Sequence, residues 1–206
     1  MKNFEAAIFD MDGLLLDSER LAFETFQDTC EDLKTGDLSV LFKSLLGTNS
    51  ELGEALLKEG LKEIVDYTVF CKLWDEKYSK LTDSAPIPLK KGVLDLLEHF
   101  TKCGLPMAVA TSTATGRAKS KLKSSGITDY FRVIVGGDQV SKSKPNPDIY
   151  LRAAAELSCN PTRCLAFEDS ANGVKAAVAA EMTVIQIPDL VQPDKELMKL
   201  GHIVLS

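Results

Sequence analysis

Two aspartates, Asp10 and Asp12, stand two residues apart at the end of the short apolar run Ala6-Ala7-Ile8-Phe9, directly before Gly13. If strand geometry continues to Asp12, both carboxylates point the same way, because side chains alternate along a strand. Two such carboxylates repel each other unless a cation or a shared proton offsets the charge. Gly13 lets the backbone turn sharply at this point. The pattern predicts an acidic site at the end of a buried strand.

A second pair of carboxylates, Glu168 and Asp169, follows the apolar run at 164–167. Ser170 is suited to cap the next helix, and Gly173 would let that helix approach closely. Four acidic groups at neighbouring strand ends call for a hard cation. Mg²⁺ is the expected ion, since it prefers oxygen ligands and usually keeps waters or substrate oxygens.

Groups that could bind phosphate occur in two other segments. Thr111 and Ser112 end the apolar run at 106–110, where a hydroxyl and exposed amides could hold a phosphate oxygen or simply cap a helix. Lys144 stands in the segment 141–150, which Pro145 and Pro147 stiffen. Its ammonium would then be fixed in place, although a solvated lysine beside a proline turn is the alternative.

These segments together resemble the haloacid dehalogenase-like superfamily, on its phosphatase and phosphomutase branch. DMDGLLLDSE matches D-x-D-G-x-x-x-D-[ST], and KPNPDIY matches K-P-x-P-[DE]-[IL]-[YF]. EDSANGVKAA matches [ED]-D-[ST]-x-x-G-[VI]-x-A-[AG]. Each signature alone is weak or moderate, but the set occurs in the family's order and covers nearly the whole chain.

The resemblance implies a role for each residue. Asp10 is expected to attack phosphorus and form an aspartyl-phosphate, with Asp12 as general acid and base. Thr111 and Ser112 are expected to bind the substrate phosphate, and Lys144 to neutralise it and the nucleophile. Mg²⁺ is expected on the carboxylates of Asp10 and Asp169 and on the backbone carbonyl of Asp12, with Glu168 acting through water.

The implied reaction is hydrolysis of a small phosphomonoester, such as a sugar phosphate. The alternative is a β-phosphoglucomutase-like phosphomutase, which uses a cap histidine and an arginine. Ala22 stands at the matching histidine position, and residues 47–50 contain no arginine, so we favour hydrolysis. A dehalogenase would leave Asp12 idle. A phosphonatase would need a cap lysine; Lys43 and Lys77 are present but cannot be placed.

A non-catalytic regulator is the competing class. Receiver domains also place aspartates, a threonine and a lysine on a parallel sheet, but they are shorter and have no inserted cap. A pseudoenzyme would usually have lost a motif residue, and none is missing here. Turnover of a generic aryl phosphate would separate these classes.

The hydrophobic pattern predicts an α/β fold with a Rossmann-like, doubly wound parallel sheet. Expected strands at 4–10, 106–111, 133–135, 164–167, 183–187 and 203–205 alternate with helices at 90–102, 115–124, 147–157 and 171–180. Ligands bind at the carboxyl ends of such strands. Four further helices are expected at 18–36, 38–46, 50–60 and 61–81, before a linker at 82–88. We therefore predict a core domain of residues 1–16 and 84–206, and a helical cap domain of residues 17–83.

Composition sets the remaining expectations. The 206 residues are 45% hydrophobic and 26% charged, with a net charge of −6, which is ordinary for a soluble globular protein. This charge disfavours nucleic acids and anionic membranes as partners. We find no signal peptide and no run long enough to cross a bilayer. The five cysteines lack metal-type spacing. We expect a cytoplasmic monomer with reduced cysteines that acts on a small phosphorylated metabolite.

Overall fold

A computed structural model describes residues 4–46, 48 and 50–205. Within these residues, a 6-stranded sheet has the order β3-β2-β1-β4-β5-β6, and all of its strand pairs are parallel. The strands are β1 (Ala6–Phe9), β2 (Met107–Ala110), β3 (Val133–Val135), β4 (Cys164–Glu168), β5 (Thr183–Gln186) and β6 (Ile203–Val204). The predicted α/β class is confirmed.

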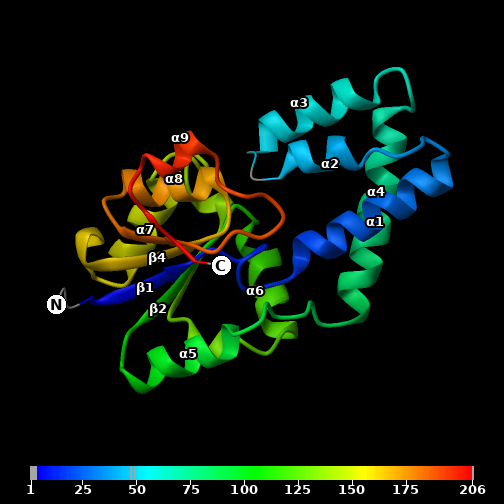
Figure 1. Cartoon of the computed structure of the whole chain (residues 1–206). Coiled ribbons are helices and arrows are strands. Elements are labelled where there is room, and N and C mark those ends of the chain that lie inside the picture. The colour runs from blue at the N-terminus through cyan, green and yellow to red at the C-terminus, as the bar shows by residue number, and fades with distance from the viewer. Residues whose placement is uncertain (1–3, 47, 49, 206) are drawn as a thin grey trace.

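Helices cover both faces of the sheet (Figure 1). The core helices are α5 (Val93–Lys102), α6 (Thr115–Ser124), α7 (Asp148–Glu156), α8 (Ala171–Ala179) and α9 (Lys195–Met198). Buried side chains of α7 and α8 pack on one face, and those of α5 and α6 pack on the other. Strands β1, β2 and β4 are therefore buried at every position, which explains their continuous apolar runs.

The four predicted cap helices form between β1 and β2. They are α1 (Ser18–Leu33), α2 (Ser39–Leu45), α3 (Ser50–Leu61) and α4 (Tyr67–Ser84). Figure 1 shows them beside the sheet rather than on either of its faces. Their buried side chains form a separate apolar cluster made of Phe26, Cys30, Phe42, Leu57, Leu61 and Phe70. This separate core supports the proposed division into a core and a cap at residues 17–83.

Several predicted helix limits were wrong, and the helix expected at 18–36 ends at Leu33. The helix expected at 61–81 begins at Tyr67, because Asp66 caps it by accepting a hydrogen bond from the N–H of Val69 at 3.0 Å. It then continues to Ser84, into the predicted linker. The helix expected at 90–102 begins only at Val93, since the left-handed backbone of Gly92 (φ 84°) precedes it.

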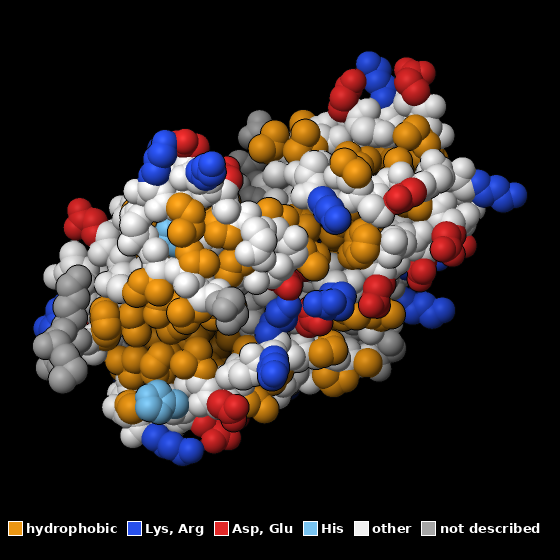
Figure 2. Space-filling view, viewed as in Figure 1, with side chains coloured by type: hydrophobic (Ala, Val, Ile, Leu, Met, Phe, Trp, Pro, Cys, Tyr) orange, Lys and Arg blue, Asp and Glu red, His pale blue; other side chains and the backbone are white. Residues whose placement is uncertain are grey.

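The surface shows no dominant charge on the face seen in Figure 2, where acidic and basic side chains are interspersed. Among the described residues, no helix is both long and apolar enough to cross a membrane. All five cysteines are free thiols, as expected. The expectations of a monomer, of a cytoplasmic location and of no nucleic-acid partner stay predictions.

Candidate active site

Asp10 lies directly after β1 and is 7% exposed. Its backbone N–H donates to the carbonyl of Phe167 at 3.0 Å, which fixes it beside the end of β4. The Lys144 ammonium donates to Asp10 Oδ1 at 2.5 Å and to Glu168 Oε1 at 2.6 Å. Carboxylate oxygens of Asp10, Glu168 and Asp169 lie within 4.8 Å of one another. The parallel topology thus brings together residues that are far apart in the sequence.

Asp12 lines the same cavity as Asp10 and Asp169 and is held by three donors. Ser18 and Lys121 donate to Oδ1 at 2.7 and 2.8 Å, and Thr113 donates to Oδ2 at 2.7 Å. Burial alone raises the pKa of Asp12, but the Lys121 charge and these hydrogen bonds outweigh it, so the pKa lies below its ordinary value. Asp12 is therefore an oriented, ionised carboxylate in this arrangement.

Gly13 makes a tight turn directly after the two aspartates. Its φ is +84°, and its N–H donates to the carbonyl of Leu16 at 2.9 Å. A Cβ atom at this position would lie 2.4 Å from Oδ2 of Asp169. Only glycine therefore satisfies both the backbone conformation and the close approach of the carboxylate.

Glu168, at the end of β4, is completely buried and saturated with hydrogen bonds. Its Oε1 accepts from Lys144 and from the Tyr150 hydroxyl, each at 2.6 Å. Its Oε2 accepts from the N–H groups of Asp169 and Ser170 at 3.2 and 3.3 Å, and from the Ser170 hydroxyl at 3.2 Å. This arrangement fits the expected indirect role of Glu168 at a metal better than direct ligation.

Gly173 permits this burial, because a Cβ there would lie 1.9 Å from the Glu168 carboxyl group. Ser170 caps α8 as predicted, since its hydroxyl accepts from the N–H of Gly173 at 3.1 Å. The first turn of α8 thus packs directly on a buried carboxylate. That contact explains the glycine four residues after Asp169.

The acidic cluster holds more negative charge than Lys144 alone offsets. Burial, followed by the charges of Glu168 and Asp12, raises the pKa of Asp10 to about 8, although Lys144 opposes the shift. Burial and the charge of Asp10 also raise the pKa of Asp169 well above its ordinary value. The charges of Asp10 and Glu168 keep Lys144 protonated by raising its pKa, despite its burial. The remaining negative charge of the cluster can therefore be offset by a bound cation or by protons.

Asp169 supplies the observation that favours a cation. Its Oδ1 is buried and has no hydrogen-bond partner among the described residues. Its backbone carbonyl accepts from the Gln186 side chain at 3.0 Å, which fixes the residue at the end of the sheet. An unpaired, buried carboxylate oxygen is costly, so the donor set fits a hard ion with oxygen ligands.

A cavity of about 320 Å³ joins these residues to the cap. Thr111, Ser112 and Thr113 line it from the end of β2, together with Lys144 from the segment before α7. The Thr111 hydroxyl accepts from the N–H of Thr113 at 3.1 Å, which orders this loop. The structure therefore brings every predicted site residue to one edge of the sheet.

Sequence reasoning missed several residues that hold the site. Ser18, at the expected start of the helix at 18–36, could cap that helix by its residue type. Asp17 occupies the N-cap position of α1 instead, and the Ser18 hydroxyl donates to Asp12. Lys121 comes from α6 and gave no signal, because its contact joins residues 109 positions apart. Tyr150 was the last position of the lysine motif, so its aromatic hydroxyl was a signal that went unused.

Comparison with known proteins assigns the family. The family model described as haloacid dehalogenase-like hydrolase matches residues 7–187. The chain belongs to this family. The structure and the motifs place it on the phosphatase branch of the superfamily, and it is a hydrolase of phosphoric monoesters.

Three relatives illustrate the similarity. The phosphorylated carbohydrates phosphatase of Thermotoga maritima is 34% identical over 202 residues, or 98% of this chain and 93% of that protein. The structure of CbbY from Rhodobacter sphaeroides, in complex with xylulose-(1,5)bisphosphate, has a TM-score of 0.76 at 28% identity and covers 98% and 93% of the two chains. A β-phosphoglucomutase from Clostridium difficile shares the fold, with a TM-score of 0.77 at 21% identity and coverage of 98% and 91%.

Proposed function

We propose that this haloacid dehalogenase-like hydrolase is a Mg²⁺-dependent phosphatase that cleaves a small phosphomonoester through an aspartyl-phosphate on Asp10. One observation carries the proposal. Asp10 accepts from the buried Lys144 and lies near Asp169, one of whose oxygens is unpaired, while Asp12 is held separately by its own donors. Two carboxylates in such different environments suit two different chemical roles.

The metal ligands proposed are the carboxylates of Asp10 and Asp169 and the backbone carbonyl of Asp12. Glu168 would act through a water, since its own oxygens already accept hydrogen bonds. A bound Mg²⁺ would offset the charge of Asp10 and of the phosphate. The choice of Mg²⁺ rests on the all-oxygen donor set.

Asp10 would attack phosphorus, and the phosphate–alcohol bond would break as the phosphate–carboxylate bond forms. Lys144 would neutralise the phosphate, and Thr111 and Ser112 would bind its oxygens from the end of β2. Phosphoryl transfer depends chiefly on positioning and electrostatic stabilisation, and the contact between Lys144 and Asp10 would contribute to both once Asp10 is ionised.

Asp12 is ionised before substrate binds, so it would first take a proton from the substrate's phosphate monoanion and pass it to the leaving alcohol as the phosphorus–oxygen bond breaks. It would then take a proton from the water that attacks the aspartyl-phosphate. General acid–base help of this kind contributes roughly 10²- to 10⁴-fold. The three hydrogen bonds from Ser18, Thr113 and Lys121 orient the carboxylate for this task.

The substrate class proposed is a small phosphorylated metabolite, in agreement with the phosphatase and CbbY relatives. We favour hydrolysis over a mutase reaction because Ala22, which lines the cavity, has no polar side chain to delay water. Of the loop 47–50, residues 47 and 49 lie outside the described residues, so the prediction made from that loop rests on sequence alone.

The test is phosphate release from a panel of phosphorylated metabolites, with Mg²⁺ and after chelation. Asp10→Asn should fold normally and reduce kcat to a small fraction of wild type. Retention of most of kcat would exclude Asp10 as the nucleophile. Full activity after exhaustive chelation would exclude the metal.

A further inference from the structure

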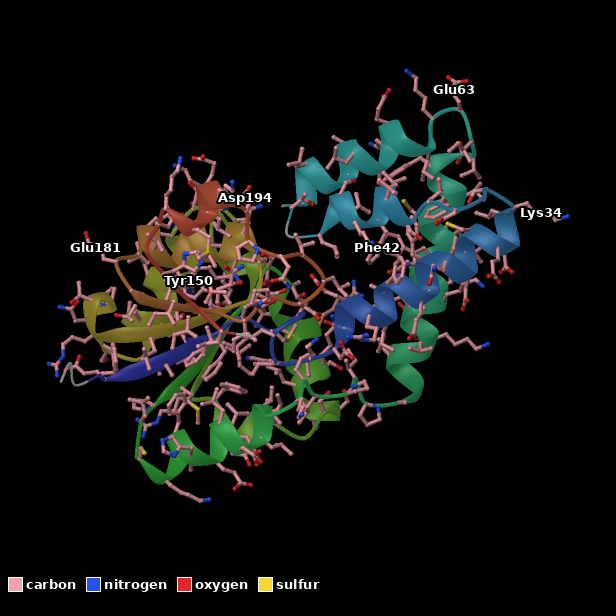
Figure 3. The ribbon with its side chains drawn as sticks, in the orientation of Figure 1. Lys34, Phe42, Glu63, Tyr150, Glu181 and Asp194 are labelled. Carbon is pink, nitrogen blue, oxygen red and sulfur yellow. The ribbon has the colours of Figure 1, made fainter. Side chains whose placement is uncertain are left out.

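The cap side of the active-site cavity is apolar. Ala22, Phe42, Leu45, Leu46 and Trp74 line it from α1, α2, the end of α2 and α4. Figure 3 shows Phe42 pointing from α2 toward α1, into the interior of the cap. Among the described residues, the cap contributes no lysine, arginine or histidine to the lining.

The hydrogen-bond donors on this wall already donate to acceptors within the cap. The Trp74 indole N–H donates to the carbonyl of Ala22 at 3.1 Å and to the hydroxyl of Thr25 at 3.2 Å. The hydroxyl of Thr48, which also lines the cavity, donates to the carbonyl of Leu45 at 2.6 Å. These two groups are therefore committed to the cap's own structure.

The wall is also packed firmly from behind. The Phe42 ring lies 5.2 Å from the Phe26 ring and 6.1 Å from the Trp74 ring, measured between centroids. Phe26 is completely buried, and its ring lies 5.1 Å from that of Trp74. Because these rings are closely packed, they cannot easily move aside and let polar groups behind them reach the cavity.

The charged lining groups gather instead on the core side. Asp10, Asp12, Lys144 and Asp169 come from the core, and the carboxyl carbon of Glu19 lies 3.1 Å from where a Gly13 Cβ would be. Glu19 thus belongs to the acidic end of the cavity, although it starts on the first turn of α1. The phosphate end of the cavity is charged, and the opposite end is apolar.

We propose that the alcohol half of the substrate is an apolar group, aliphatic or aromatic, rather than a polyol. This inference rests on the proposed phosphatase function and narrows its substrate class. It also separates this chain from the relative named for phosphorylated carbohydrates. A sugar hydroxyl buried against this wall would lose water without gaining a partner, whereas a methylene group would gain contact.

The experiment compares esters matched in carbon number. Phosphate release is measured from n-butyl phosphate against erythritol 4-phosphate, and from n-pentyl phosphate against ribitol 5-phosphate. All are primary alkyl esters, and the hydroxyls make the polyols slightly better leaving groups, so intrinsic reactivity opposes the expected result. We expect kcat/KM to favour each alkyl ester by about tenfold or more, the value of one unsatisfied buried hydroxyl.

Equal or better turnover of the polyol esters would overturn the inference while leaving the phosphatase proposal intact. Failure to hydrolyse any of the four esters, or an aryl phosphate, would instead remove the phosphatase proposal on which it rests. The two failures are thus distinguishable.

Wall variants give a second test. Leu45→Asn adds an amide to the lining and should lower the alkyl-to-polyol ratio by about fivefold or more. Ala22→Ser is the milder variant if Leu45→Asn does not fold, as judged by circular dichroism. Val69→Asn is the control, since Val69 lies on α4, is 50% exposed and does not line the cavity. An unchanged ratio in the folded wall variants would contradict the proposal.

Discussion

Magnesium affinity should fall steeply as the pH drops below about 8, because protons occupy the acidic cluster in the absence of metal. Burial raises the pKa of Asp10 to about 8, so below that pH its carboxyl group is largely protonated in the folded protein. The metal binds only the ionised form. One displaced proton makes the apparent dissociation constant rise about tenfold for each pH unit below 8, with no change above it. The raised pKa of Asp169 adds a second proton and steepens the dependence.

Isothermal titration calorimetry measures both the apparent dissociation constant of Mg²⁺ and the number of protons released on binding. Mg²⁺ is titrated into chelator-stripped protein between about pH 6 and pH 9, in buffers of different ionisation enthalpy. At about pH 7 we expect roughly 0.9 proton released per ion from Asp10 alone, with the Asp169 contribution in addition. The Asp10→Asn variant cannot release the first proton, so the Mg²⁺ affinity of this variant should depend less steeply on pH.

An affinity that stays within about twofold between pH 6 and pH 8 would refute this reasoning. It would mean that Lys144 suffices to keep Asp10 ionised without a metal. Proton uptake instead of release would have the same consequence, because it would reverse the sign expected for an acid with a raised pKa.

Three further outcomes are expected. Lys121→Met should lower kcat about 100-fold with little change in KM, because Asp12 loses the ammonium that orients its carboxylate. Lys119→Met, at an exposed position of the same helix, should leave kcat unchanged. An equal loss of kcat in the two variants would contradict the positioning role of Lys121. Gly173→Ala should lower the free energy of unfolding by about 2–3 kcal/mol in chemical denaturation, because its Cβ meets a buried carboxyl group, whereas Gly116→Ala has open space and should not destabilise. With β-glucose 1-phosphate, Mg²⁺ and a trace of the bisphosphate, any turnover should release free phosphate; efficient glucose 6-phosphate formation without phosphate release would show that Ala22 was misinterpreted.

The strands and the site residues could be predicted because their signals are local. A buried parallel strand is a short apolar run, and the reactive side chain follows it within one or two residues, as Asp10 follows β1. The parallel order of the sheet then brings Asp10, Thr111 and Glu168 to the same edge. Neither step needs knowledge of side-chain packing.

The parts that were missed depend on tertiary contacts. Lys121 reaches Asp12 only because the fold brings α6 close to the residues that follow β1, and no local pattern distinguishes this lysine from the exposed lysines of that helix. The Ser18 hydroxyl donates to Asp12, a contact that depends on how the chain between them turns and that no local pattern shows. The start of α4 was predicted wrongly for a similar reason, because Asp66 lies within a continuous apolar pattern that does not reveal its role as a helix cap.

The position of β1 in the middle of the sheet has a consequence for how the chain folds. Ala7 pairs with Met107 on one side and with Leu165 on the other, so the strand that ends at the proposed nucleophile has only distant neighbours in sequence. Contacts of such long range form slowly, because much chain must be ordered before they are made. During synthesis, β1 leaves the ribosome well before either neighbour exists, while the helices of residues 18–84 can already pack on one another. The cap is therefore expected to be structured first, with the catalytic edge completed only after β4 has been synthesised.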